Sequence, residues 1–172
     1  MGVVVTGAPA LVSAVAAMQP NSLDIVGEMG LKPGRWRTTI QIVDAAIVPT
    51  PGRPVPAGAA ERLKQAIGSS MDTEDCIGSI RPPGSDLVLP GVKIEAACVL
   101  GEVEADQRIL RIKGTCGSMA KGFKADMNVQ AAHSATAMTA NVESLAFSEG
   151  VGFSTRIIVT TNSKYMGQCP AR

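Results

Sequence analysis

Apolar and polar residues alternate through the second half of the chain, and this pattern predicts a succession of β-strands. Strands are expected near residues 93–101, 107–116, 122–131, 134–145 and 152–162, each followed by a short polar or glycine-containing link. In the third segment Lys124, Asp126 and Asn128 alternate with apolar neighbours, as in a sheet with one face in water. Five consecutive strands with short links predict an antiparallel meander.

The first half of the chain contains fewer regular elements. Alternation over residues 35–43 predicts a strand with Trp36 pointing inward, and the prolines within 49–56 predict an irregular loop. Residues 59–71 change to a helical period with a narrow apolar stripe, which suits one amphipathic helix lying on a sheet. After that helix, at most a short strand over residues 86–89 is expected before the meander begins.

The expected fold is mainly β, an antiparallel meander that forms a barrel or a strongly curved half-barrel, because closure removes exposed strand edges. One short helix would lie against an end or the open side. The chain has 172 residues, which is of single-domain size. We expect a leader over residues 1–17 and one β domain over residues 18–172.

The leader is predicted from the apolar stretch of residues 3–17, in which Ala14 and Ala16 fit a signal-peptidase pattern of small residues. The alternative is a short buried helix or a first strand of the mature domain. No other segment approaches the roughly 18 apolar residues of a membrane-spanning helix. The protein is therefore expected to be periplasmic or secreted and not to span a membrane.

Four cysteines with wide spacings, and no C-x-x-C motif, favour two disulfides over a metal site. The alternative is four reduced cysteines in a cytosolic protein. Cys98 and Cys116 each share parity with apolar residues, and a hairpin turn between their strands would bring them near register. We favour Cys98 with Cys116, which leaves Cys76 with Cys169, although four cysteines allow three connectivities.

Composition excludes several classes of partner. A formal net charge of +1 offers no field that would attract nucleic acid or anionic lipid, and aromatic residues make up only 3% of the chain. Gly150-Val151-Gly152 leads into a predicted strand rather than a helix, so it does not indicate a phosphate loop. No cofactor is expected, and the interior should consist of small aliphatic side chains.

Two residue patterns could carry catalysis, and both have simpler interpretations. Ser118 and Lys121 match an S-x-x-K pattern in which lysine activates a serine nucleophile, but they lie in a predicted hairpin turn and the companion motifs are absent. His133 is the only histidine, which excludes metal sites with several histidines. Its small neighbours favour an exposed turn residue over a general base, and the protein is not expected to be an enzyme.

Two acidic clusters could hold calcium, although neither has the glycine and ligand series of a calcium loop. A solvated acidic turn is the preferred interpretation of each, and no metal site is predicted. The clusters are Glu102, Glu104 and Asp106, and Asp72, Glu74 and Asp75.

Several short motifs occur in an order that resembles a known family. Lys32-Pro33-Gly34 followed by Trp36 opens the first strand, an acidic segment precedes the first cysteine, and the later cysteines follow as Cys98, Thr115-Cys116 and Gly167-Gln168-Cys169. This order resembles the bacterial domain-of-unknown-function family number 3617, small exported four-cysteine β proteins. The resemblance covers nearly the whole mature chain. It implies an exported β protein of the cell envelope, and it implies no catalytic residue.

The sequence supports three functional hypotheses of different classes. The preferred one is a non-catalytic binding module that holds an apolar small molecule or lipid between aliphatic side chains of the sheet. The second is a structural component that binds an envelope protein through a strand edge or the proline-rich loop. The third, least favoured, is a hydrolase that uses Ser118 and Lys121.

Overall fold

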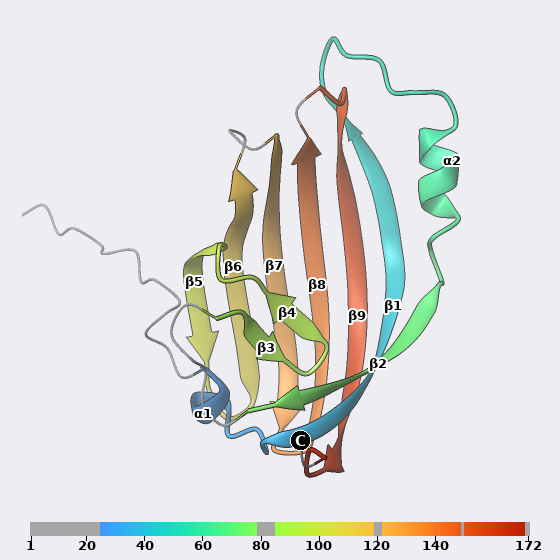
Figure 1. Cartoon of the computed structure of the whole chain (residues 1–172). Coiled ribbons are helices and arrows are strands. Elements are labelled where there is room, and N and C mark those ends of the chain that lie inside the picture. Colours follow the sequence, from blue (N-terminus) through green and yellow to red (C-terminus); the bar gives the residue numbers. More distant parts are fainter. Residues whose placement is uncertain (1–24, 79–84, 119–121, 149, 171–172) are drawn as a thin grey trace, which may run out of the picture.

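The described part of the chain is built around one seven-stranded antiparallel sheet (Figure 1). The computed structural model describes residues 25–78, 85–118, 122–148 and 150–170. The strands lie side by side in the order β2-β1-β9-β8-β7-β6-β5. Their bounds are β1 Gly34–Pro49, β2 Ser70–Ile77, β5 Val99–Ala105, β6 Ile109–Ser118, β7 Phe123–Ser134, β8 Ala137–Ser148 and β9 Phe153–Gly167.

The five strands β5 to β9 form the antiparallel meander that the alternation predicts. Each pairs with the next in the sequence through a short link, such as the turn of Ala135 and Thr136 between β7 and β8. β9 then pairs along its length with β1, and β1 pairs with β2. The mainly β, antiparallel fold is thus confirmed.

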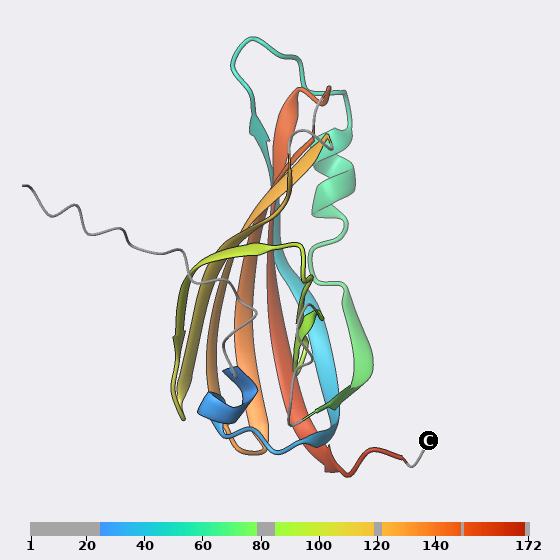
Figure 2. The same cartoon turned by 60° about the vertical axis from the view of Figure 1, so that its left-hand side comes forward.

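The sheet has two open edges, β2 and β5, and no pairing among the described strands joins them. It curves, so that one face is concave (Figure 2). The closed barrel, one of the two expected forms, is therefore not seen in the described residues. Instead, a hairpin and a helix lie against the concave face, in the space that would be the interior of a closed barrel.

This second layer fills the lower half of the concave face (Figures 1 and 2). It consists of α1 (Ile25–Met29) and the hairpin of β3 (Leu87–Leu89) and β4 (Val92–Ile94). Their apolar side chains share one core with the lower part of the sheet, where Trp36 is fully buried as predicted. The fully buried side chains of the sheet in this core include Leu110, Ile112, Val129 and Met138.

Four elements differ from the sequence prediction. The helix expected over 59–71 is α2 (Ala59–Lys64), followed by turns and then by β2, which was not expected. The strand expected over 93–101 is two strands, β4 and β5, separated by a turn. α1 was also not expected. β2 is an edge strand whose side chains are mostly exposed, so it lacks the apolar face that reveals a strand in a sequence.

Two disulfides connect the chain, between Cys98 and Cys116 and between Cys76 and Cys169. Strand parity favoured the first of these pairs, and the second was expected by elimination. The Cα atoms are 4.1 Å and 5.8 Å apart, respectively. The first bridge joins the residue directly before β5 to β6, and the second ties the end of β2 to the segment after β9. Two disulfides indicate an oxidising compartment rather than the cytoplasm.

None of the helices in the described ranges is long and apolar enough to cross a membrane.

Candidate functional site

Among the residues that the structure describes, none forms over the upper half of the concave face a second layer like the one that fills the lower half. Cross-strand partners share a face of a sheet, so the register extends the inward face upward from the buried Trp36 and Met138. We call the twelve residues found in this way the upper concave surface. They are Ile42, Ala45 and Ile47 of β1, Phe153, Thr155, Ile157 and Val159 of β9, Val142, Ser144 and Ala146 of β8, and Ala125 and Met127 of β7.

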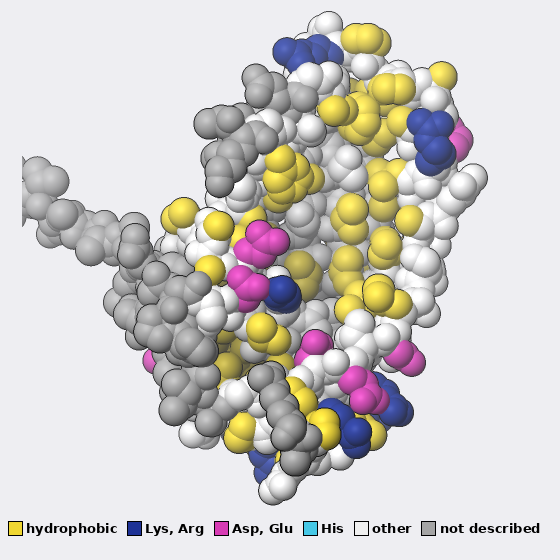
Figure 3. Space-filling view, viewed as in Figure 1, with side chains coloured by type: hydrophobic (Ala, Val, Ile, Leu, Met, Phe, Trp, Pro, Cys, Tyr) yellow, Lys and Arg dark blue, Asp and Glu magenta, His cyan; other side chains and the backbone are white. Residues whose placement is uncertain are grey.

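This surface is apolar and only partly covered. Ten of its twelve side chains are aliphatic, aromatic or thioether groups, and the other two, Ser144 and Thr155, carry only a hydroxyl. All except the buried Ala45 are half-buried. Figure 3 shows hydrophobic side chains gathered along the upper parts of β9 and β1. A contiguous apolar patch of this kind on a protein surface is typical of a binding site.

A β-bulge in β1 gives the surface its composition. Ile42 pairs with Val159, but the next partner along β9, Ile158, pairs with Asp44, so Val43 is an extra residue. Before the bulge the even positions of β1 face inward, and after it the odd positions do. Ala45 and Ile47 therefore extend the apolar surface, while Asp44 faces the convex side.

A pocket of about 340 Å³ forms where α2 approaches the upper end of β1 and β9. Ile47, Phe153 and Thr155 line it from the sheet, and Ala59, Leu63 and Arg62 line it from α2. This volume lies at the small end of the range of ligand sites, which is roughly 300 to 1,000 Å³. Because Ile47, Phe153 and Thr155 belong to the upper concave surface, the pocket adjoins the rest of that surface along β9, where the inward side chains are Ile157 and Val159.

Several charged residues on the convex face of the sheet form ion pairs. Arg156 bonds to Glu143 at 2.6 Å and to Asp44 at 3.2 Å, and the first of these bonds is the main cause of its raised pKa. Glu74 accepts a bond from Arg37 at 2.7 Å, which lowers the pKa of that carboxyl. The two faces of the upper sheet thus differ sharply, one with paired charges in water and the other with partly covered hydrocarbon.

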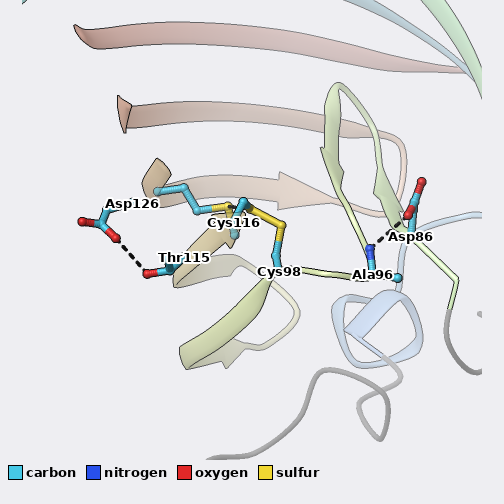
Figure 4. Close-up of a disulfide and its surroundings, with 7 residues drawn as sticks. Asp86, Ala96, Cys98, Thr115, Cys116 and Asp126 are labelled. Carbon is cyan, nitrogen blue, oxygen red and sulfur yellow. Dashed lines mark hydrogen bonds between the residues drawn. A yellow bond between two sulfur atoms is a disulfide. The ribbon is translucent and has the colours of Figure 1, made fainter. Parts of the chain in front are cut away.

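The Cys98–Cys116 disulfide borders the upper concave surface on its β6 side (Figure 4). Cys116 Sγ lies 3.9 Å from Met127 Sδ, so the bridge continues the apolar wall beyond β7. Thr115 and Asp126 point away from the disulfide and form a 2.8 Å hydrogen bond in which the hydroxyl donates. That bond is the main cause of the lowered pKa of Asp126, with Lys124 contributing.

His133 differs from its prediction as an exposed turn residue. It lies within β7 opposite Met138, so its side chain faces the core, and the turn comes later at Ala135 and Thr136. Both of its ring nitrogens are buried, and neither has a hydrogen-bond partner among the described residues. Of the small neighbours that suggested a turn, Ala131, Ala132 and Ser134 are strand residues paired with β8, and only Ala135 lies in the turn. His133 lies at the lower end of the sheet, away from the upper concave surface.

The S-x-x-K pattern is only partly described. Ser118 is the last residue of β6, and Lys121 lies outside the described residues, so no relative geometry can be given for the two.

Most of the acidic side chains in the two clusters bond either across strands or within their own turn. Glu102 and Glu104 form ion pairs with Lys113 and Arg111 at 2.9 and 2.7 Å. Asp106 accepts the backbone N–H groups of Ile109 and Arg108, which lower its pKa.

The other cluster is spread along the β2 edge. Asp72 accepts a bond from the hydroxyl of Thr39, and Glu74 accepts one from Arg37. Over the described ranges, no group of three or more His, Cys, Asp or Glu side chains is placed to hold a metal ion.

Sequence reasoning anticipated an apolar site but missed the residues that form it. In the sequence, most of the inward positions, such as Val142 and Ile157, look like ordinary core residues. The helical pattern predicted a helix on the sheet but did not indicate which strands it would contact. One signal could have been used: the inward positions of β8 and β9 stay apolar over a greater length than a hairpin as short as β3–β4 can cover. Comparisons with family models, with curated proteins and with solved structures gave no match in any of the three.

Proposed function

We propose that the protein is an exported, non-catalytic binding module of the bacterial cell envelope that holds an apolar small molecule or lipid. The observation that carries this proposal is the contrast between the two halves of the concave face. In the lower half, the chain covers the sheet with its own hairpin and helix. In the upper half, aliphatic side chains remain half-buried around a pocket of about 340 Å³.

The burial of apolar surface would supply most of the binding free energy. Removing such surface from water stabilises a complex by roughly 25 cal/mol for each Å². The site lacks the paired acid and base groups that catalysis usually needs, because the inward side chains are hydrocarbon or hydroxyl. Because the curved sheet is open on one side, a flexible ligand can reach the concave face without any strand pairing being broken.

Export to the periplasm or secretion is part of this proposal. It is supported by the two disulfides, which persist in oxidising compartments, and by the leader pattern over residues 1–17. Membership in the domain-of-unknown-function family number 3617 is proposed on the ordered motifs, in which Gly34 and Trp36 open β1 and all four cysteines are paired.

The test compares two adjacent isoleucines on opposite faces of β9. Ile157 faces the upper concave surface, and Ile158 faces the convex side, yet both are half-buried and lie in the same strand. Wild-type protein, Ile157→Gln and Ile158→Gln are purified gently from envelope material and examined by native mass spectrometry. A co-purified apolar ligand is expected on wild type and Ile158→Gln and should be lost from Ile157→Gln.

A second measurement covers the case in which the natural ligand is lost during purification. The neutral dye Nile red is titrated into the same three proteins, and its emission should rise with wild type and Ile158→Gln but much less with Ile157→Gln. A wild-type protein that is empty in every preparation and does not bind Nile red would contradict the proposed function.

The β5 edge favours a second candidate, an interaction component of the envelope. β5 pairs on one side only within the described sheet, and its first residue, Val99, is 64% exposed. An exposed edge can accept a strand from a partner. A photo-crosslinker at Val99 that captures the same envelope protein in repeated experiments would support this function, and the absence of a reproducible product would count against it.

A further inference from the structure

Arg62 differs from the arginines of the sheet because it stands beside hydrocarbon. It lines the 340 Å³ pocket together with Leu63 and Phe153. The convex arginines Arg37, Arg111 and Arg156 each form an ion pair with a carboxylate at 3.2 Å or less. Among the ion pairs of the described residues, none involves Arg62.

Among the described residues that line the pocket, Arg62 is therefore the only charged one. The other lining groups are hydrocarbon and the hydroxyl of Thr155, which can donate a hydrogen bond. A guanidinium presents a planar pair of N–H donors that fits a carboxylate. A single positive charge matches a ligand head with a single negative charge.

The hydrocarbon wall extends from this pocket in one direction. On β9 the inward residues run from Phe153 through Ile157 to Val159, a distance of roughly 20 Å at the usual rise per residue. Val142 flanks this line on the neighbouring strand β8, and Met127 lies one strand further away on β7, where both side chains also pack against the lower core. The groove ends where Gly91 of the hairpin packs on Thr161 and closes the lower half.

We propose that the ligand is a single-chain amphiphile with a carboxylate head, of the long-chain fatty acid type. Its carboxylate binds Arg62 at the α2 end, and its hydrocarbon chain lies along β9 over Ile157 and Val159. This inference rests on the proposed function, because it names the class of ligand for the same surface. The small pocket and the single positive charge favour one chain and one negative charge over a two-chain phospholipid.

The test varies the head of the ligand and the charge of the protein separately. Delipidated, oxidised wild-type protein is titrated by calorimetry with palmitate and with hexadecanol, which has the same chain length and a neutral head. The protein variants are Arg62→Gln, Arg62→Lys, Ile157→Gln and, as a control on the same helix, Lys64→Gln. Lys64 is exposed and does not line the pocket.

Palmitate should bind wild type at least tenfold more tightly than hexadecanol does. Arg62→Gln should remove that preference while leaving the affinity for hexadecanol unchanged. Arg62→Lys, which keeps the positive charge, should retain part of the preference for palmitate. Lys64→Gln should behave as wild type. Ile157→Gln should weaken both ligands, because it alters the wall along which the chain lies.

The outcomes separate the ligand class from the function itself. Equal binding of the two ligands to wild type, or an Arg62→Gln protein that retains the preference for palmitate, would overturn the carboxylate assignment and leave apolar binding intact. Preference for a two-chain anionic phospholipid in vesicles would overturn the single-chain assignment. Binding of neither ligand, together with no response to Nile red, would overturn the proposed function.

Discussion

Gly91 at the turn of the β3–β4 hairpin lies directly on Thr38 of β1. A Cβ atom at this position would come 2.5 Å from Thr38 Cγ2 and 3.0 Å from Thr161 Cβ. Thr38 in turn shares a buried 2.8 Å hydrogen bond with Ser163. This contact fixes the hairpin to the middle of the sheet, and it marks the boundary between the filled and the open halves of the concave face.

Replacing Gly91 with alanine should dislodge the hairpin. Its φ of +72° is unfavourable for a residue with a side chain, and the added methyl group would overlap Thr38. We expect a loss of about 3 kcal/mol in the free energy of unfolding, measured in urea. Gly68→Ala is the matched control, since Gly68 has a φ of +85° with no atom within 4 Å, and it should cost only about 1 kcal/mol. Equal losses would show that Thr38 is not crowded.

The two disulfides should contribute differently to stability. They join residues 18 and 93 positions apart, and in the loop-entropy description these closures stabilise the fold by about 3 and about 4.5 kcal/mol, respectively. We therefore expect the double variant Cys76→Ala and Cys169→Ala to unfold at lower urea than Cys98→Ala and Cys116→Ala. The reverse order would mean that the shorter bridge acts mainly through packing beside Met127.

Oxidation of all four thiols can be checked independently. Intact mass without reductant should be four hydrogen masses below the mass after reduction, as expected for two disulfides. Peptide mapping should recover Cys98 with Cys116 and Cys76 with Cys169. Four free thiols in native material would contradict both the pairing and the oxidising compartment.

Acid should destabilise the fold through Asp106, among other carboxylates. Backbone donors from Ile109 and Arg108 lower its pKa in the folded state. The resulting stabilisation is present above the unfolded pKa of about 3.9 and is lost as the pH falls through the lower folded pKa. Urea unfolding between pH 7 and 2.5 should show a smaller acid-side loss for Asp106→Asn than for wild type. Superimposable pH profiles would contradict this assignment.

Removing the imidazole of His133 should stabilise the protein. Both ring nitrogens are buried and have no hydrogen-bond partner within the described part of the chain, and such groups carry an uncompensated desolvation cost. His133→Met should raise the free energy of unfolding by about 1 kcal/mol. His133→Gln is the control, because it keeps buried polar atoms and should give no gain. A destabilised His133→Met would indicate that the imidazole has a favourable role in the core.

The alternation of apolar and polar residues predicts much of this fold, because side chains that face inward on one strand pair with side chains that face inward on the next. Trp36 faces the core, as the alternation of its strand requires. Cys98 lies opposite Cys116 because the next residue, Val99, pairs with Thr115. Parity could not predict β2, whose apolar positions are few, or the reach of the β3–β4 hairpin. That reach depends on packing between Gly91 and strands far away in the sequence.

The candidate site was predictable in kind but not in position. An interior of small aliphatic residues indicated free space, yet the identity of the uncovered residues depends on which half of the sheet the hairpin covers. Arg62 also gave no signal in the sequence, because a single charged residue on a short helix is ordinary. Its importance comes from lining the same pocket as Phe153.

The extra residue in β1 decides which side chains of that strand reach the groove. Val43 has no partner on β9, so Asp44 pairs with Ile158 and Ala45 pairs with Ile157. If Val43 paired with Ile158 in a regular ladder, Asp44 and Ala46 would turn toward the concave side, and Ile47 would turn away from it. Deleting Val43 would straighten the strand and leave the later residues on their present faces. The bulge thus lets β1 carry one additional residue without placing a carboxylate against the hydrocarbon.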